Sequence, residues 1–376
     1  MLKKRIASLA VAALATSLVA ISTPASFAET PKAKSASRAS AGDLCLGAGL
    51  KAAGRGVEGS TLTCMKVTTG TSAGSLRWWY ADLKPLKNID WTIPANPGGY
   101  SITSNAISDA LKAEGLLSEY TAVYKPGAGG SVGLGAFQEI KGKPESALIT
   151  GIAMTGGLYS NKSTLNLLDS TPVAKMIREY EALVVPADSP IRNLKDFLAA
   201  IKANPSGVAI AGGNKGGVDH QTVGLLAEKV GVDATKLNYV VYSGGTEVIT
   251  SLLSGATKVG ISGSSEFSAF VASGRLRVIG VSSPRPLKGF AGKTFIQQGI
   301  DLTYHNWRGV MAPGDLSDAN RLNFVKVLDT LRASDSWKAQ MVKNNWQSDF
   351  LGGKDFKDFL TAHIPAINKV MKGLGI

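Results

Sequence analysis

Short β-like runs alternate with helical stretches through most of this chain, and that alternation restricts its fold more than any other feature. The expected strands are residues 89–93, 121–124, 148–153, 181–185, 208–211, 239–242, 259–261 and 277–281. The expected helices are residues 104–116, 132–140, 194–204, 220–230, 247–253 and 267–272, before a mostly helical tail over residues 318–373. Such alternation predicts parallel sheets in an α/β fold. The pattern is longer than one domain commonly is, so we expect two lobes.

Four glycine-rich turns each stand between a strand and a helix of this pattern. They are residues 96–99, 127–131, 212–217 and 243–246. Glycine lets backbone N–H groups approach a ligand closely, and a helix N-terminus carries a partial positive charge. In open α/β sheets such turns lie at the carboxyl ends of the strands, where ligands bind. Together they predict a cleft for an anion such as a carboxylate. The alternative is that each glycine serves only its own turn.

The sequence indicates no cofactor and no metal site. Residues 127–133 miss the spacing of the dinucleotide-binding fingerprint by one residue, and no Gly-Lys-Ser/Thr phosphate loop occurs. The three histidines, His220, His305 and His363, form no pair at helical spacing. We therefore expect neither kind of group to be bound.

A secreted serine hydrolase is a weaker alternative. The pattern Gly-x-Ser-x-Gly occurs around Ser72 and around Ser131. It is meaningful when it forms a strand-to-helix turn and a histidine and an acid follow. Ser131 has the better position, with His220 or His305 as its partner. A chain with 43 glycines produces such matches by chance, so we expect no catalytic residue and no enzyme.

The N-terminal segment has the features of an export signal. Residues 3–5 are basic, an apolar run follows to about residue 21, and Pro24 precedes a stretch of small residues. This pattern predicts a signal peptide over residues 1–28, cleaved after Ala28. The apolar run is shorter than a membrane span requires. We expect an exported protein, located in the periplasm or on the outer face of the cell membrane or cell wall.

Two further segments precede the α/β pattern. Residues 29–41 are small, polar and basic, which is typical of a flexible linker. Residues 42–82 contain both cysteines, Cys45 and Cys64, which predict one disulfide in an exported chain. Closing a loop of about 20 residues stabilises a fold by roughly 3 kcal/mol. We expect a small disulfide-stapled β module over residues 42–82, too short to bury a core alone.

The net charge of +13 restricts the class of partner. Nucleic-acid binding usually gathers Lys and Arg on one element with interleaved aromatic residues. Here the basic residues are scattered, so we expect no nucleic-acid partner. A positive field does raise the rate at which an anion is captured.

Eight segments, in order along the chain, carry a family resemblance. They are residues 93–99 (IPANPGG), 125–133 (KPGAGGSVG), 184–186, 189–197, 213–220, 241–245 and 273–277, with 307–313 (WRGVMAP) completing the series. They resemble the receptor proteins of tripartite tricarboxylate transporters, the Bug family, from about residue 87 to residue 376. The resemblance implies a two-lobed, type II periplasmic-binding-protein-like fold. Lobe 1 would comprise residues 86–187 and 305–376, and lobe 2 residues 188–304.

The resemblance also implies a function and a set of ligand-binding residues. The protein would hold a small organic acid between its lobes, largely by backbone amides and waters, and deliver it to membrane permease subunits. We expect a monomer. The matching positions are Gly98, Gly99, Tyr100, Gly130, Ser131 and Thr155 in lobe 1, with Asn214, Gly216, Gly217, His220, Tyr242 and Gly244 in lobe 2.

The chain departs from the family pattern at two acidic positions. Ile102 or Thr103 stands where the first loop usually has an aspartate, and Ser262 stands where an acidic residue is common. A cleft with fewer negative groups favours a more anionic ligand, so we expect a di- or tricarboxylate, with a neutral or aromatic ligand as the alternative. A ligand-sensing partner of a membrane signalling protein is an alternative function for the same fold.

Overall fold

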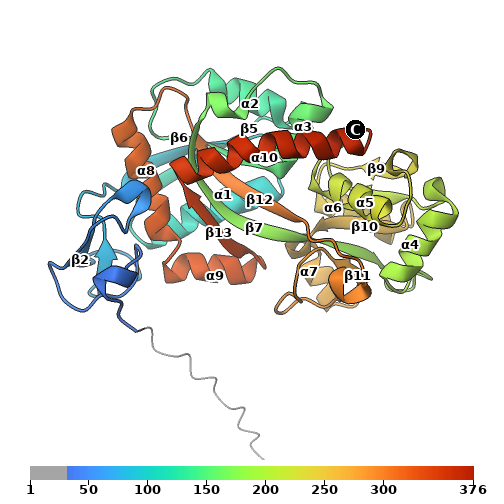
Figure 1. The fold of residues 1–376 in the computed structure, drawn as a ribbon, viewed down its shortest axis with the longest axis horizontal. Helices are drawn as coiled ribbons and strands as arrows, with labels where there is room; N and C mark the ends of the chain where they lie inside the picture. Colours follow the sequence, from blue (N-terminus) through green and yellow to red (C-terminus); the bar gives the residue numbers. More distant parts are fainter. Residues whose placement is uncertain (1–31) are drawn as a thin grey trace, which may run out of the picture. The chain divides into compact units, whose positions relative to one another are not determined.

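The computed structural model describes residues 32–376, so the predicted signal peptide lies outside the described residues. A ten-stranded sheet runs through the α/β body and confirms the expected α/β fold class (Figure 1). The sheet is mixed and not parallel throughout as expected, because β7 pairs antiparallel with all of its neighbours. Its strands are arranged as two lobes that share one long strand, β7 (Thr171–Pro186).

Lobe 1 is built around one half of this sheet. Strand β4 pairs in parallel with β5 and β6, and β12 joins β6 to β7 in antiparallel pairing. The strands are β4 (Leu86–Ile93), β5 (Leu117–Tyr124), β6 (Ser146–Gly151), β12 (His305–Ala312) and β13 (Gln347–Gly352). The helices are α1 (Gly99–Ala113), α2 (Ser131–Gln138), α3 (Ile152–Ser160), α8 (Asp318–Leu331) and α9 (Asp335–Lys343). Trp91, Ile107, Phe324 and Trp337 lie in one apolar core of this lobe.

Lobe 2 is built around the other half. The second part of β7 pairs antiparallel with β10 and β11, and β8 lies parallel between β10 and β9. The strands are β8 (Ile210–Gly212), β9 (Tyr239–Val241), β10 (Val259–Gly263) and β11 (Leu276–Val281). The helices are α4 (Leu194–Ala203), α5 (Val218–Lys229), α6 (Gly245–Leu253) and α7 (Ser264–Ala272). Phe197, Leu226 and Ile261 form part of its core.

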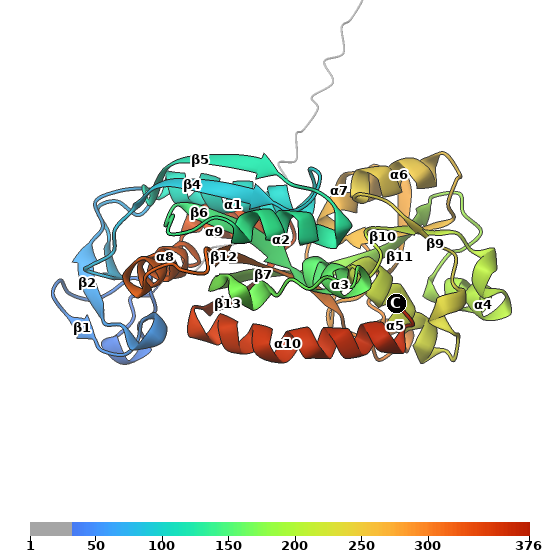
Figure 2. The ribbon, with the colours of Figure 1, turned by 90° about the horizontal axis from the view of Figure 1, so that it is seen from above.

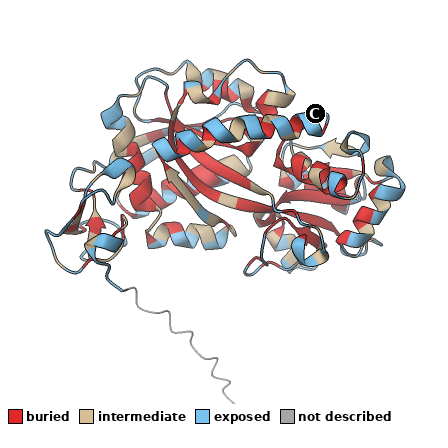
Figure 3. Cartoon of the chain, in the orientation of Figure 1, coloured by how far each residue is buried: buried red, intermediate tan, exposed pale blue. Residues whose placement is uncertain are grey.

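Two elements connect the lobes. Residues 171–180 of β7 pair with β12 in lobe 1, and residues 181–186 pair with β10 and β11 in lobe 2. Helix α10 (Lys354–Gly373) runs alongside both lobes (Figure 2). Its Met371 packs on Gly216 of lobe 2, and the following Leu374 packs on Gly224. The strands inside both lobes are buried, whereas the outer faces of α9 and α10 are exposed (Figure 3).

The cysteine module is a three-stranded antiparallel sheet of β1 (Lys51–Ala52), β2 (Leu62–Lys66) and β3 (Leu76–Trp79). The predicted disulfide between Cys45 and Cys64 is present. Residues 33–41, which composition led us to expect as part of a flexible linker, are folded instead. The Lys34 carbonyl accepts a hydrogen bond from the Trp78 indole (3.0 Å), and Ala39 and Ala41 are fully buried. Their small side chains fit into the core of the module.

The module is held against lobe 1 by polar contacts. The Tyr80 hydroxyl donates to the buried carboxylate of Asp329 at 2.5 Å. Arg321 contacts both carboxylate oxygens of Glu58, at 2.5 and 2.9 Å. These contacts with lobe 1 therefore stabilise the module in addition to its own small core.

Candidate functional site

A cleft of about 100 Å³ lies between the two lobes. From lobe 1 it is lined by Ala95, Asn96, Gly98, Gly99, Tyr100, Ala153, Asn306 and Arg308. From lobe 2 it is lined by Gly213, Asn214, Gly217, Val218, Asp219, Ser243, Gly244, Ser262, Gly263 and Glu266. Two hollows of about 260 and 340 Å³ adjoin the cleft and share Asn96 and Ser243 with it.

Four helices have an N-cap residue that lines this cleft, one from lobe 1 and three from lobe 2, and Ala153 in the first turn of α3 also lines it. Their N-cap residues are Gly98 for α1, Gly217 for α5, Gly244 for α6 and Gly263 for α7, and none has a side chain to cap the helix. The first N–H groups of a helix have no partner within the helix, and they carry its partial positive charge. These N–H groups suit a carboxylate wherever a side chain of the protein does not already accept from them.

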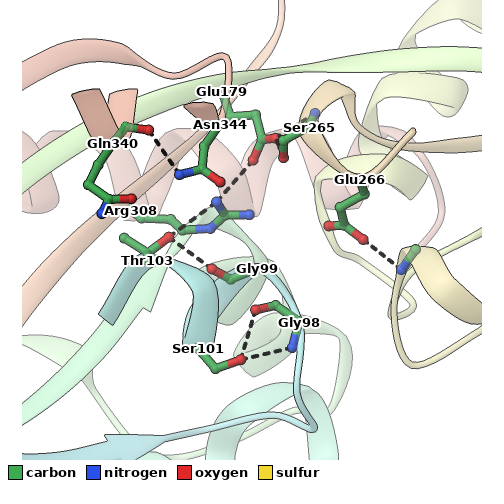
Figure 4. Close-up of polar contacts among 11 residues, drawn as sticks. Gly98, Gly99, Ser101, Thr103, Glu179, Ser265, Glu266, Arg308, Gln340 and Asn344 are labelled. Atoms are coloured by element: carbon green, nitrogen blue, oxygen red, sulfur yellow. Dashed lines mark hydrogen bonds and ion pairs between the residues drawn. The ribbon is translucent and has the colours of Figure 1, made fainter. Parts of the chain in front are cut away.

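Arg308 is the one cationic side chain among the residues that line the cleft. It lies on β12, is 4% exposed, and donates to Glu179 at 2.9 Å and to the Thr103 hydroxyl at 3.3 Å (Figure 4). Gly99 leaves no room for a side chain, because a Cβ there would occupy the space of the guanidinium group. Glycine at this position thus lets α1 begin directly beside Arg308.

Four carboxyl groups gather beside the cleft, where β7 meets the helices of lobe 2. Glu179 accepts hydrogen bonds from Arg308 and from both the backbone N–H and the hydroxyl of Ser265. Glu266 accepts from the backbone N–H of Gly245 at 2.7 Å, and Asp219 accepts from that of Gly213 at 2.7 Å. Glu181 is fully buried, and in its protonated form its carboxyl hydrogen-bonds that of Asp219.

Burial and mutual repulsion keep part of this cluster protonated. Burial, followed by the charge of Asp219, raises the pKa of Glu181 well above its usual value. Burial also raises the pKa of Asp219, and it raises that of Glu266 to about 7, with a smaller contribution from Glu179. Two carboxyls held close together in a buried place cannot both ionise readily, so Glu181 retains its proton beside Asp219.

The expectation that this cleft has fewer acidic groups is therefore wrong. Ser262 does lack a carboxylate, but Glu266 supplies one from the first turn of α7, four residues later. Asp219 supplies another from the first turn of α5. An isolated position in a motif does not reveal a carboxylate that reaches the same place from the next turn of helix.

The charged residues of the cleft were not predicted from the sequence. Arg308 stands within the segment 307–313 that carried the family resemblance, and a lone arginine in an otherwise apolar strand needs a buried partner. That partner, Glu179, lies 129 residues away in the chain. Asp219 lines the cleft, whereas its neighbour His220, which the resemblance predicts as a ligand contact, does not. For both Arg308 and Asp219, the available signal in the sequence is a charged residue among apolar and small ones.

Six of the predicted residues line the cleft: Gly98, Gly99, Tyr100, Asn214, Gly217 and Gly244. The hydroxyl of Tyr100 accepts a hydrogen bond from the backbone N–H of Met154 at 3.1 Å, and its burial raises its pKa to about 12. Gly130 lines the adjoining hollow that also includes Asn214.

The remaining predicted residues do not line the cleft. Thr155 lines a separate hollow beside α10, and Gly216 packs against Gly156 and Met371. His220 stacks on Tyr239 with ring centroids 4.2 Å apart, and its Nδ1 accepts from the Gly216 N–H. Tyr242 packs against an apolar cluster of lobe 2.

Ser131 also has a local role. Its hydroxyl donates to the carbonyl of Ala128 at 2.9 Å, within its own turn. Within residues 32–376, no group of three or more His, Cys, Asp or Glu side chains is arranged to hold a metal ion. In the same part of the chain, no helix is both long enough and apolar enough to cross a membrane.

Three solved structures share this fold. A TctC solute-binding protein from Polaromonas, without ligand, is 21% identical with a TM-score of 0.58, covering 77% of this chain and 99% of its own. A Rhodopseudomonas palustris protein with adipate is 17% identical with a TM-score of 0.68, covering 78% and 98%. MatC from the same organism, with bound malate, is 14% identical with a TM-score of 0.63, covering 77% and 98%.

The sequence comparisons identify the family. The UPF0065 protein in the tcbD-tcbE intergenic region of a Pseudomonas species is 25% identical over 219 residues, which are 58% of this chain and 64% of that protein. The match thus spans less than two thirds of that relative's length. The model of the tripartite tricarboxylate transporter family receptor matches residues 116–335, more than half of the chain. This chain therefore belongs to the tripartite tricarboxylate transporter receptor family.

Proposed function

We propose that this protein is an exported solute-binding receptor that captures a small organic acid between its lobes and delivers it to the membrane permease subunits of a tripartite transporter. The observation that carries this proposal is the convergence of four glycine-capped helix N-termini, from both lobes, on one cleft that also contains Arg308. Backbone donors at helix N-termini bind carboxylates without a large number of positive side chains.

Two further observations support the proposal. The structures with malate and with adipate are both complexes of a carboxylate with a protein of this fold. The Cys45–Cys64 disulfide fits an exported location, because disulfides persist mainly in oxidising compartments. The sequence favours a di- or tricarboxylate only if the cleft has few acidic groups. Because Asp219 and Glu266 line the cleft, that argument does not apply.

A ligand screen with a blocked variant tests the function. We expect at least one small organic acid to raise the unfolding temperature, since a ligand at 100 times its Kd stabilises by about 2.7 kcal/mol. Gly244→Leu should abolish that shift. Gly244 has an extended backbone that any residue adopts, and a Cβ there meets no atom within 4 Å, so the side chain fills the cleft at little structural cost.

Lys202→Leu, on the exposed face of α4, is the matched control and should keep the ligand-induced shift. The proposal fails if no organic acid stabilises the protein, or if Gly244→Leu binds as well as the wild type. Ester hydrolysis that disappears in Ser131→Ala would favour the hydrolase instead.

A further inference from the structure

We propose that the cleft selects a small amino-carboxylate, with one carboxylate and one protonated amine, over di- and tricarboxylates. This inference rests on the proposed function and names the ligand class of the same cleft. The two walls of the cleft differ in charge, and that difference gives the ligand an orientation.

The lobe 1 wall provides the binding site for the carboxylate. Here the N-terminus of α1 begins at Gly99, directly beside the guanidinium group of Arg308. No acidic residue from lobe 1 is among those that line the cleft. A carboxylate on this wall meets backbone N–H donors at the start of α1 and a guanidinium group whose charge is shared with Glu179, and both favour an anion.

The lobe 2 wall is already occupied by the protein's own carboxylates. At the start of α6, the N–H of Gly245 donates to Glu266, and at the start of α7, the N–H of Ser265 donates to Glu179. Two of the three helix N-termini on this wall thus have an internal anion. The third, that of α5, has Asp219 in its first turn.

A second ligand carboxylate on that wall would therefore face like charges. Asp219 and Glu266 line the cleft there, and no lysine or histidine is among the lining residues. Glu179 pairs with Arg308, so the one cation is largely neutralised. A dicarboxylate would bind only after a proton is taken up by Glu266 or by the ligand, whereas a protonated amine finds two acceptors in place.

Glu181 affects the charge of Asp219. It is fully buried behind this wall, and in its protonated form it hydrogen-bonds Asp219. Its carboxyl lies beside that of Asp219, whose charge raises the pKa of Glu181. A cation bound against Asp219 would stabilise the ionised form of Asp219 while Glu181 keeps its proton. An anion in the same place would oppose that ionisation.

The experiment compares ligands that differ only in this group. Small amino acids are each matched with the monocarboxylate and the dicarboxylate of equal carbon number, for example 4-aminobutyrate with butyrate and succinate. Dissociation constants are measured by isothermal titration calorimetry at pH 7.5. We expect the best amino-carboxylate to bind at least tenfold more tightly than its matched dicarboxylate. Glu266→Gln should reduce that ratio at least tenfold, and Glu228→Gln, exposed on α5, should leave it unchanged.

Proton uptake gives a second readout that needs only the wild type. Titrations in two buffers of different ionisation enthalpy should show proton uptake with a dicarboxylate and less with an amino-carboxylate. The inference is overturned if the dicarboxylate binds as tightly as its amino partner or more so, or if folded Glu266→Gln keeps the wild-type ratio. If neither class binds, it is the proposed function that fails.

Discussion

Arg308 is a buried charge that depends on its immediate neighbours. Taking an ion pair out of water is costly, and removing one partner leaves the other charge uncompensated. Here Glu179 is the partner at 2.9 Å, and Gly99 provides the space in which the guanidinium group lies. The position of the Arg308 guanidinium therefore depends on Gly99 having no side chain.

Substituting Gly99 tests this dependence. In Gly99→Ala the new Cβ would overlap the Arg308 guanidinium, so the side chain must move and its contact with Glu179 weakens. We expect a loss of about 1–3 kcal/mol of stability, as for other overpacked sites, and at least tenfold weaker ligand binding. Urea unfolding and calorimetry measure the two effects.

The adjacent Gly98→Ala is the matched control. A Cβ at Gly98 comes no closer than 3.9 Å to another atom, and the extended backbone there suits any residue. Its stability should change little. Equal losses in the two variants would show that the guanidinium does not depend on Gly99.

Glu266 makes stability depend on pH in a defined direction. Its pKa is raised from 4.5 to about 7 by burial and by Glu179, so the folded protein holds a proton that the unfolded chain loses between these values. The contribution is fully present below pH 4.5 and is lost as the pH rises through 7. Burial of His220, His305 and His363 lowers each pKa to about 4. The stability that these neutral histidines contribute is present above pH 6.5 and is lost as the pH falls towards 4, which is opposite to the effect of Glu266.

Because these effects overlap, the prediction concerns a difference between two proteins. The unfolding free energy of Glu266→Gln minus that of the wild type should rise by about 1–3 kcal/mol between pH 5 and pH 8, since glutamine never has to ionise. Urea titrations across this range measure it, and Glu228→Gln should give a flat difference. A flat result for Glu266→Gln would contradict the raised pKa.

At the scale of elements, the sequence located the helices well but placed their starts too late. The helices expected from residues 104, 220, 247 and 267 begin at Gly99, Val218, Gly245 and Ser264. Apolar periodicity becomes visible only where a helix meets the core. The first turns are made of glycine, serine and other small or polar residues without such a period, and they are the turns that face the cleft.

The strands show a related limit. Only residues 181–185 were expected as a strand, whereas β7 extends from Thr171 to Pro186. Its first part includes Lys175 and Glu179, which break the apolar run. Each is paired in the fold, Lys175 with Asp349 and Glu179 with Arg308, but these partners lie more than 100 residues away. Long-range pairing of this kind leaves no local pattern, so β12 and the charges of the cleft were missed for the same reason.

The docking of the cysteine module gives a prediction at this scale. In Tyr80→Phe, the buried Asp329 loses a donor at 2.5 Å and the N–H of Val57 loses its acceptor. We expect a loss of about 1–3 kcal/mol, the usual cost of leaving buried polar groups unpaired. Tyr120→Phe, which removes an exposed hydroxyl bond to Asp109, is the control and should change stability little. Equal effects in urea unfolding would mean that the module is not held through Tyr80.

At the scale of the whole molecule, the charge outside the cleft and the charge inside it have different roles. The chain has a net charge of +13, and a positive field increases the rate of encounter with anions. Inside the cleft, Arg308 is balanced by Glu179, and two further carboxyls line the opposite wall. We therefore expect long-range attraction to raise the rate at which carboxylates meet the protein, and the proposed asymmetry of the cleft to select among them.

Binding between two lobes also requires that the lobes remain coupled, and α10 provides a test. Leu374, just after α10, is 2% exposed and packs on Gly224 of lobe 2, whereas Ile367 of the same helix is 3% exposed and lies in an apolar cluster centred on lobe 1. Truncating either side chain to alanine should cost about 2–5 kcal/mol. Only Leu374→Ala should also loosen lobe 2, so that urea unfolding becomes less cooperative and ligand binding weakens beyond what Ile367→Ala shows. Since both variants remove a similar buried volume, equal effects on cooperativity and affinity would mean that β7 alone couples the lobes.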